Sequence, residues 1–212
     1  MAQKWRSTRE EKKSATMSGQ ESSENSRSRP RPATPIDTAR LDRLALDYVA
    51  RYATTSLKLQ HYLSRKIMQA RQSGTLDEAA AQALGDHAAQ IIARFAERGY
   101  VNDRAWAEMK ASALRASGYG ERRVRETLRH NGIESAVVDE IGLAPDEEGN
   151  MDPRFEIALR FARRHRIGPF SRTHQDEQKI NRDIARLMRA GHPYDIARKI
   201  ATMAATDIDV SA

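Results

Sequence analysis

Arginine residues recur at helical spacing in this chain, and their chemistry is that of anion binding. On an ideal helix, which turns by about 100° per residue, Arg182, Arg186 and Arg189 fall within roughly 60° of one another. They lie nearly opposite the apolar residues Ile180 and Ile184. A guanidinium group binds a phosphate or a carboxylate through two parallel hydrogen bonds. Because this helix face carries no acidic residue, the stripe predicts a surface that binds oxyanions.

A second arginine stripe precedes the first in the sequence. Arg122, Arg125 and Arg129 also fall within about 60° of one another, with Arg123 beside them and Val124 turned away. A third cluster stands on the helix expected after residue 152. Ordinary ion pairing on a solvated surface remains the alternative for each cluster. The candidate binding residues are Arg122, Arg123, Arg125, Arg129, Arg160, Arg163, Arg164, Arg182, Arg186 and Arg189.

Catalytic, cofactor and metal motifs are missing from the sequence. The segment Gly118–Gly120 could open a dinucleotide-binding loop, but no strand is expected before it and Arg123 stands where the third glycine would be. The segment therefore predicts a turn between helices. The six histidines are scattered without zinc-ligand spacing, and the acidic residues 146–148 fall in an expected linker without a shaped pocket. We expect no enzyme activity, no cofactor and no metal.

Composition supports a polyanion partner and a helical fold. The 36 Lys and Arg residues against 29 Asp and Glu give a net charge of +7, which attracts polyanions over long range. Aromatic residues make up only 6% of the chain, so the core must be built from aliphatic side chains. There is no cysteine and no run of about 20 apolar residues that could span a membrane. A cytoplasmic protein is expected.

Apolar residues follow a helical period from Thr38 onward. Leu41, Leu44, Ala45, Tyr48 and Tyr52 form the expected inner face of a first helix. The threonine and serine residues at 54–56 can cap a second helix, and the residues at 75–78 form a capping-box pattern that predicts Thr75 as the cap of a third.

Two further helical units are expected downstream. The second opens with a helix whose predicted buried face contains Trp106, Met109, Ala113 and Leu114. The third opens at Asp152-Pro153, an N-cap followed by a proline at the first helical position, and its middle helix is expected to be capped near Thr173.

An internal repeat organises these helices. Four residues of the second unit align with four of the third at an offset of 59: Leu128, Gly132, Val137 and Ile141 with Leu187, Gly191, Ile196 and Ile200. The expected fold is all-α, with three tandem three-helix repeats forming an elongated, curved array and a disordered N-terminal tail. The expected boundaries are 1–37 for the basic tail, 38–99, 100–142 and 152–205 for the repeats, 143–151 for a linker and 206–212 for a C-terminal tail.

Several segments resemble those of the RecX family of bacterial regulatory proteins. They are ERGYVNDRAWA at 97–107, GYGERRVRETLRHNGI at 118–133, ALRFARR at 158–164 and IARLMRAG at 184–191. The resemblance spans about residues 40–203. It implies a modulator of RecA, the recombinase that polymerises on single-stranded DNA. Family members are thought to lie along the filament groove and touch both protein and DNA. They inhibit strand exchange and ATP hydrolysis or halt filament growth, which affects recombination, DNA repair and the SOS response.

The expected partners are therefore the RecA filament and single-stranded DNA, with double-stranded DNA as a second nucleic acid, no membrane, and a monomeric state. An alternative function is a helix-turn-helix transcriptional regulator that reads DNA with the helix after Gly120. The exposed positions of that helix are mostly arginine rather than the Asn, Gln or Ser that read bases, which favours backbone or acidic-surface contact. A nuclease is disfavoured because no carboxylate cluster could hold metal ions.

Overall fold

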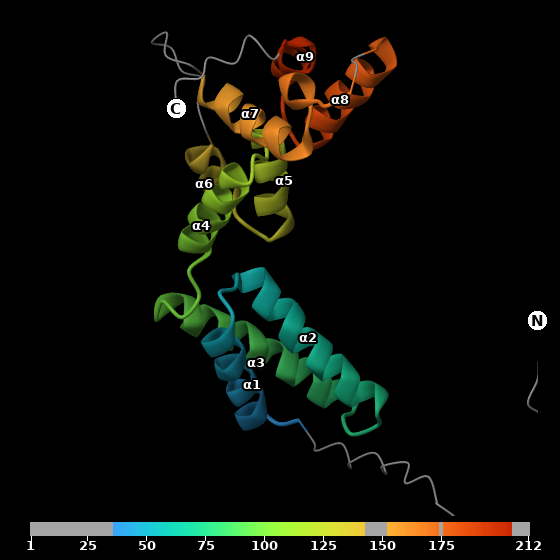
Figure 1. Cartoon of the computed structure of the whole chain (residues 1–212). Coiled ribbons are helices and arrows are strands. Elements are labelled where there is room, and N and C mark those ends of the chain that lie inside the picture. The colour runs from blue at the N-terminus through green and yellow to red at the C-terminus, as the bar shows by residue number, and fades with distance from the viewer. Residues whose placement is uncertain (1–35, 143–151, 174–175, 205–212) are drawn as a thin grey trace, which may run out of the picture. The chain divides into compact units, whose positions relative to one another are not determined.

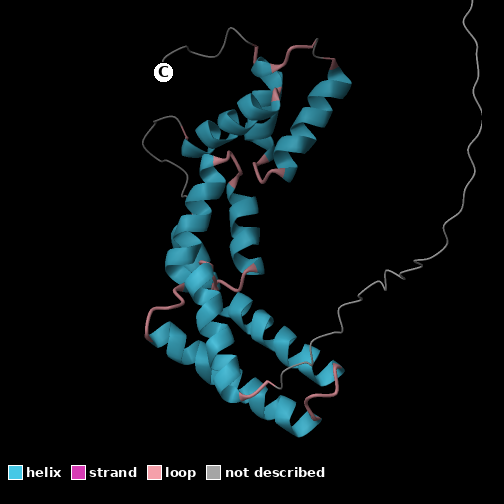
Figure 2. Ribbon diagram, turned by 60° about the horizontal axis from the view of Figure 1, so that its bottom comes forward, coloured by secondary structure: helices cyan, strands magenta, loops and turns pink. Residues whose placement is uncertain are grey.

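The computed structural model describes residues 36–142, 152–173 and 176–204 of the chain, and within these ranges the regular structure is entirely helical (Figures 1 and 2). This confirms the all-α prediction for the described residues. The predicted tail up to residue 35, the linker 143–151 and the residues from 205 onward lie outside them. The helices are α1 (Thr38–Arg51), α2 (Ser56–Gln72), α3 (Glu78–Glu97), α4 (Asp103–Ala116), α5 (Glu121–His130), α6 (Ser135–Ile141), α7 (Pro153–His165), α8 (Glu177–Arg189) and α9 (Tyr194–Thr202), with a 3-10 turn at Gly168–Phe170.

The first three helices enclose one hydrophobic core. Its fully buried members include Leu41 of α1, Leu59 and Leu63 of α2 and Ile91 of α3. Ile36 is also buried in this core, immediately before the residue that caps α1. The core is mainly aliphatic, with Phe95 of α3 buried among its residues.

Three expectations for this group can be compared with the structure. Thr55 accepts a hydrogen bond from the Lys58 amide and caps α2, as predicted from residues 54–56. Tyr52 was expected to face inward but is 58% exposed, because α1 ends at Arg51 and the chain leaves the helical path there. The prediction of Thr75 as the α3 cap is also wrong. Asp77 caps α3, and the Thr75 hydroxyl instead donates to the carbonyl of Ala70 at the end of α2.

The second core lies among α4, α5 and α6. Trp106, Ala107 and Ala111 line α4 on its buried side, whereas Met109 is 51% exposed and Ala113 is also exposed. Trp106 is buried as predicted and Leu114 packs against this core, so the prediction was wrong for Met109 and Ala113 only. The small alanine side chains let α4 pack closely against its neighbours. A search for helical periodicity that relies mainly on large apolar side chains does not detect them.

The third core lies among α7, α8 and α9. Asp152 caps α7 and Pro153 occupies its first turn, as predicted. The expected cap near Thr173 is wrong, because α8 begins at Glu177 and Asp176 accepts a hydrogen bond from the Lys179 amide. Asp183 is buried on the inner side of α8 and pairs with Lys179 at 2.8 Å, which offsets the cost of burying its charge.

The first helical group is tied to the second at the start of α2. The Thr55 hydroxyl donates to the carbonyl of Asn131 at 2.9 Å, and the Ser56 amide donates to the Asp103 carboxylate at 2.8 Å. The Lys58 ammonium lies 4.2 Å from the centre of the Trp106 ring. Burial, and to a smaller extent repulsion from Lys110, lowers the pKa of Lys58.

Equivalent positions of the predicted repeat have similar environments in α5 and α8. Leu128 and Leu187 are both fully buried, and Gly132 and Gly191 both end a helix with positive φ angles of 80° and 100°. Within the described ranges, no helix is both long enough and apolar enough to cross a bilayer.

Candidate basic interface

Helix α5 carries four of the ten predicted binding arginines. Val124 and Leu128 bury one side of it, and Arg122, Arg123 and Arg129 project from it as exposed side chains. A helix with two buried aliphatic residues per two turns leaves most of its circumference to polar groups. The arginines on the outer faces of α5 are therefore held by a helix whose orientation is fixed by its core side.

The start of α5 is held against the end of α8 by backbone contacts. The Gly120 amide donates to the carbonyl of Ala190 at 3.0 Å, and the Arg122 amide donates to the carbonyl of Gly191 at 3.3 Å. A Cβ atom at Gly120 would lie 2.4 Å from the carbonyl carbon of Gly191, so this approach requires glycine. The contact brings two of the predicted repeats together through main-chain atoms.

That contact places one arginine of α5 beside the arginine stripe of α8. The Arg122 guanidinium donates to the carbonyl of Met188, in the last turn of α8. The same turn carries the exposed Arg186 and Arg189. Positive side chains from two sequence stripes therefore gather at the end of α8, although guanidinium groups near a helix C-terminus also gain from the helix dipole.

Arg125 and Arg129 are paired within their own helical group. Both approach the Asp139 carboxylate of α6, at 3.6 and 4.0 Å. Arg125 is half-buried, and its Nε atom has no hydrogen-bond partner among the described residues. Arg123 pairs with Glu126 at 3.6 Å. The second stripe is thus partly neutralised by two acidic residues, Asp139 of α6 and Glu126 of α5.

The arginines of α8 have polar neighbours but no acidic partner among the described residues. Arg182, Arg186 and Arg189 are all exposed. Arg182 Nε donates to the Gln178 carbonyl at 3.2 Å, and Arg186 donates to Nδ1 of His165 at 3.1 Å. Each guanidinium therefore keeps further N–H groups for an external anion.

The histidine beside Arg186 is held neutral by its surroundings. Burial makes the largest contribution to lowering the pKa of His165, and repulsion from Arg186 and Arg164 lowers it further. A neutral imidazole accepts the Arg186 N–H without adding a like charge to the stripe.

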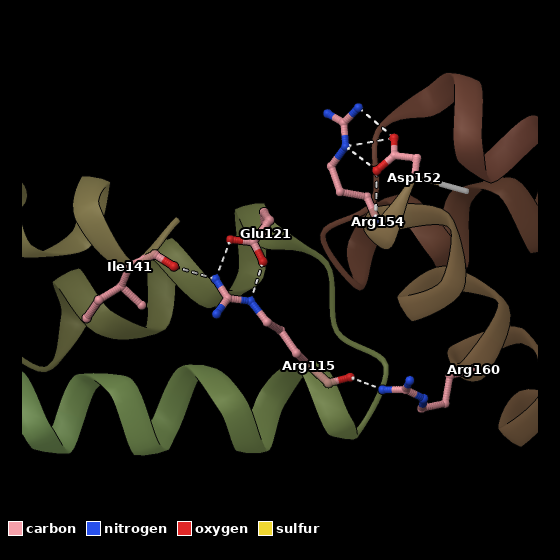
Figure 3. A network of polar contacts seen from close by, with 6 residues as sticks. All are labelled: Arg115, Glu121, Ile141, Asp152, Arg154 and Arg160. Carbon is pink, nitrogen blue, oxygen red and sulfur yellow. Dashed lines mark hydrogen bonds and ion pairs between the residues drawn. The ribbon is translucent and has the colours of Figure 1, made fainter. Parts of the chain in front are cut away.

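Helix α7 contributes the third predicted cluster, whose arginines are all exposed. Arg160 Nη1 donates to the carbonyl of Arg115 at the end of α4, at 3.2 Å (Figure 3). Arg163 lies over the Phe170 ring, 5.4 Å from its centre. Arg164 lies close enough to His165 for its charge to lower the pKa of that histidine. The cluster is therefore spread over α7 rather than focused on one point.

A buried ion pair between α4 and α5 was not found from the sequence. Arg115 Nε and Nη2 donate to the two carboxylate oxygens of Glu121 at 2.6 and 2.9 Å, and Nη2 also donates to the carbonyl of Ile141 at 2.8 Å (Figure 3). The two side chains are only 18% and 14% exposed. One arginine thus joins the end of α4, the start of α5 and the end of α6. The signal that could have found it is an acidic first residue of α5 following a basic last turn of α4.

A buried histidine joins the second and third helical groups. His192 follows α8, and its Nε2 lies 3.0 Å from the carbonyl of Gly118 in the turn between α4 and α5. Because a carbonyl only accepts, Nε2 carries the proton. Burial lowers the pKa of His192, and the hydrogen bond to Gly118 opposes that shift in part. Figure 3 also shows Asp152 and Arg154, which form a two-pronged pair at the start of α7.

No family model matches the chain. A protein named Regulatory protein RecX from Myxococcus xanthus (strain DK1622) is 35% identical over 176 residues, which cover 81% of this chain and 88% of that protein. A second, of the same name, from Trichlorobacter lovleyi is 26% identical over 116 residues, or 54% of this chain and 73% of that protein.

Two solved structures share the fold. The crystal structure of RecX from Lactobacillus salivarius matches with a TM-score of 0.51 and 19% identity, over 77% of this chain and 93% of that chain. A second crystal structure, of a regulatory protein RecX, matches with a TM-score of 0.52 and 14% identity, over 80% of each chain. At these identities the structural likeness speaks for the fold alone.

Proposed function

The chain belongs to the RecX family of regulatory proteins, and we propose that it regulates recombination by binding the RecA filament and inhibiting strand exchange and ATP hydrolysis. The observation that carries this proposal is the 35% identity to a RecX protein over 81% of the chain. Membership of a regulatory family agrees with the prediction of a protein that is not an enzyme. Recombination, DNA repair and the SOS response are the processes it would affect, in the cytoplasm.

The contact with the filament is proposed to run through the arginines of α5, α7 and α8. Arg182, Arg186 and Arg189 are exposed and keep unused N–H donors, which suits them to phosphates of DNA or carboxylates of a protein surface. Arg122 extends this surface onto α5. The main-chain contact between α5 and α8 would hold these side chains in a fixed relation during binding.

We also propose that residues 38–99, 100–142 and 152–205 are three tandem repeats. Each range contains three of the described helices and one hydrophobic core. The elongated, curved array and the monomeric state stay predictions, and small-angle X-ray scattering of the purified chain would test both.

The helix-turn-helix alternative receives no support from the surroundings of α5. A recognition helix presents its first residues to the major groove. Here the amides of Gly120 and Arg122 at the start of α5 are bonded to carbonyls of Ala190 and Gly191. A footprint on one duplex site that persists in excess competitor DNA would favour this alternative over RecA regulation.

The direct test is the ATPase activity of RecA on single-stranded DNA. Adding this protein at sub-stoichiometric and equal ratios to RecA is expected to slow hydrolysis and shorten the filaments. An unchanged rate and unchanged filament length would exclude the proposal.

The interface is tested by replacing the α8 stripe, Arg182, Arg186 and Arg189, with alanine. The triple variant is expected to lose most of the effect on RecA while keeping its helicity, because these side chains make no ion pair with the described residues. A matched control replaces Arg40, Arg43 and Arg98 on α1 and after α3, which removes the same charge elsewhere. Equal losses in the two variants would mean that net charge alone, rather than this surface, drives binding.

A further inference from the structure

Three tyrosines meet on the surface between α1 and α2, helices that carry none of the ten predicted binding arginines. The rings of Tyr48 and Tyr62 are stacked, with centroids 4.3 Å apart and an angle of 16° between their planes. The ring of Tyr52 lies 5.3 Å from that of Tyr48 at a tilt of 50°. The first helical group therefore carries a contiguous aromatic surface in a chain that is poor in aromatic residues.

These rings line a pocket of about 460 Å³. That volume lies within the range of roughly 300–1,000 Å³ that is typical of small-molecule sites. Arginines stand beside the rings, and one acidic residue is also present. The lining residues are Leu44, Asp47, Tyr48, Arg51, Tyr52, Tyr62 and Arg65.

The helix behind the pocket is basic throughout. Helix α2 contains Lys58, Arg65, Lys66 and Arg71 and has no Asp or Glu. The charged ends of Lys66 and Arg65 lie 5.6 and 5.9 Å from the centre of the Tyr62 ring. Aromatic faces interleaved with cations are the combination that binds single-stranded nucleic acid, because bases stack on the rings and phosphates pair with the cations.

Packing explains only part of this arrangement. Tyr48 and Tyr62 are half-buried and pack against the core of the first group, so they help to join α1 to α2. Tyr52 follows the last residue of α1 and is 58% exposed. A tyrosine with that exposure contributes little to the core, yet its side chain lines the pocket.

We propose that this pocket, the tyrosine site, binds an unpaired base of single-stranded DNA, stacked on the exposed Tyr52 ring, with the flanking phosphates paired to Arg51 and Arg65. The proposal deepens the function proposed above and rests on its single-stranded DNA contact. An acidic protein segment is the less favoured occupant, because it would use the cations and leave the aromatic faces without a role. Asp47 lines the same pocket and can accept a hydrogen bond from a donor on the edge of a base, such as the N3–H of thymine.

The test measures binding of the full chain to bare DNA without RecA, by fluorescence anisotropy. The probes are a short oligothymidine and an abasic oligodeoxyribose of the same length. The wild-type chain is expected to prefer the oligothymidine, and Tyr52→Leu is expected to weaken its binding by about 10-fold, a typical effect of losing one base–aromatic stack. Tyr52→Phe keeps the ring and should bind as the wild type does.

The matched control is Tyr194→Leu, which removes a tyrosine of similar exposure, 53%, from α9. It should leave binding unchanged. Arg65→Gln should weaken binding to both probes and reduce the salt dependence by about one counterion, since it acts through phosphates. Circular dichroism of each variant establishes that the helices are intact.

Several results would overturn the tyrosine site. Equal binding to oligothymidine and the abasic strand, or equal affinities of wild type and Tyr52→Leu, would show that no base stacks there. Competition by polyglutamate as strong as that by oligothymidine would assign the pocket to acidic protein. Inhibition of the RecA ATPase is measured separately, so persistent inhibition alongside any of these results would leave the proposed function standing.

Discussion

The ion pair between Arg115 and Glu121 allows a quantitative test of what holds the start of α5 in place. A double-mutant cycle with Arg115→Met, Glu121→Gln and the two combined separates the pair's own interaction from other effects of each change. The pair has two short hydrogen bonds, at 2.6 and 2.9 Å, and both side chains are more than four-fifths buried.

The magnitude follows from this burial. Removing one partner of a fully buried pair costs about 3–5 kcal/mol, because the remaining charge is left uncompensated. The residual exposure of 18% and 14% lets water reach the remaining charge, so we expect each single variant to lower the free energy of unfolding by about 3 kcal/mol. The interaction energy between the two positions should be about 2 kcal/mol. Arg115→Met has the further effect of removing the hydrogen bond to the Ile141 carbonyl.

The chain contains a matched control at the junction of α2 and α3. Arg71, in the last turn of α2, pairs at 2.9 Å with Glu78, the first residue of α3, just as Arg115 in the last turn of α4 pairs with the first residue of α5. The Arg71 and Glu78 side chains are 54% and 78% exposed. The helix-dipole effect on the glutamate is therefore similar in both pairs, while burial differs.

Urea unfolding followed by far-ultraviolet circular dichroism measures both cycles. The exposed pair should show an interaction energy of about 0.5 kcal/mol, as is usual for surface pairs. Equal interaction energies in the two cycles would refute the reasoning, because burial would then have no bearing on the strength of the pair. A change in the urea dependence of one variant would point instead to an altered unfolded state.

Three further predictions concern the α5–α8 contact, pH and the second stripe. Gly191→Ala should lower the free energy of unfolding by about 2 kcal/mol or more, since Gly191 has a φ of 100° and an added Cβ would lie 2.5 Å from the Arg123 amide nitrogen. The control is Gly74→Ala, which measures the cost of backbone strain alone, because Gly74 has a φ of 71° and an added Cβ would have no atom within 4 Å. Equal losses of stability in the two variants would argue against a tight contact at Gly191. Because folding lowers the pKa of His192, the unfolded chain takes up the histidine proton at a higher pH than the folded chain does. Thermal stability should therefore be full above about pH 6.5 and fall as the pH drops below it. His192→Gln should reduce this fall, and a pH profile identical to that of the wild type would contradict the assignment. Asp139→Asn should strengthen binding to single-stranded DNA at low salt by releasing Arg125 and Arg129, and unchanged affinity would place those two residues outside the DNA contact.

Local sequence signals predicted the helices well where each signal acts within one turn. Asp152-Pro153 begins α7 and the glycine pair at 118–120 turns the chain between α4 and α5, because capping and positive φ angles depend on residues that are neighbours in sequence. The same reasoning failed at Thr75 and Thr173. In each case an aspartate nearer the helix takes the capping position. Where several possible capping residues stand close together, the sequence pattern does not show which of them will cap the helix.

For the arginine stripes too, one property could be predicted from the sequence and another could not. Apart from the half-buried Arg125, the arginines are exposed on α5, α7 and α8, as the 3.6-residue helical period of the sequence predicts. Their partners do not follow from it. Asp139 approaches Arg125 and Arg129 from another helix, and Arg122 reaches the end of α8, 66 residues away in the sequence.

The sequence by itself determined that this chain is helical, basic and similar to RecX proteins. Helical periodicity, charge and the segments shared with the family all depend on residue types and on residues that are close together in the sequence. The tertiary structure alone decided which arginines remain available to a partner, which are neutralised by Asp139, and that three tyrosines gather between α1 and α2. These outcomes depend on which helix faces meet. That choice is made by the packing of buried side chains and glycines across the whole fold, where small residues such as Ala107 and Gly120 matter as much as large ones.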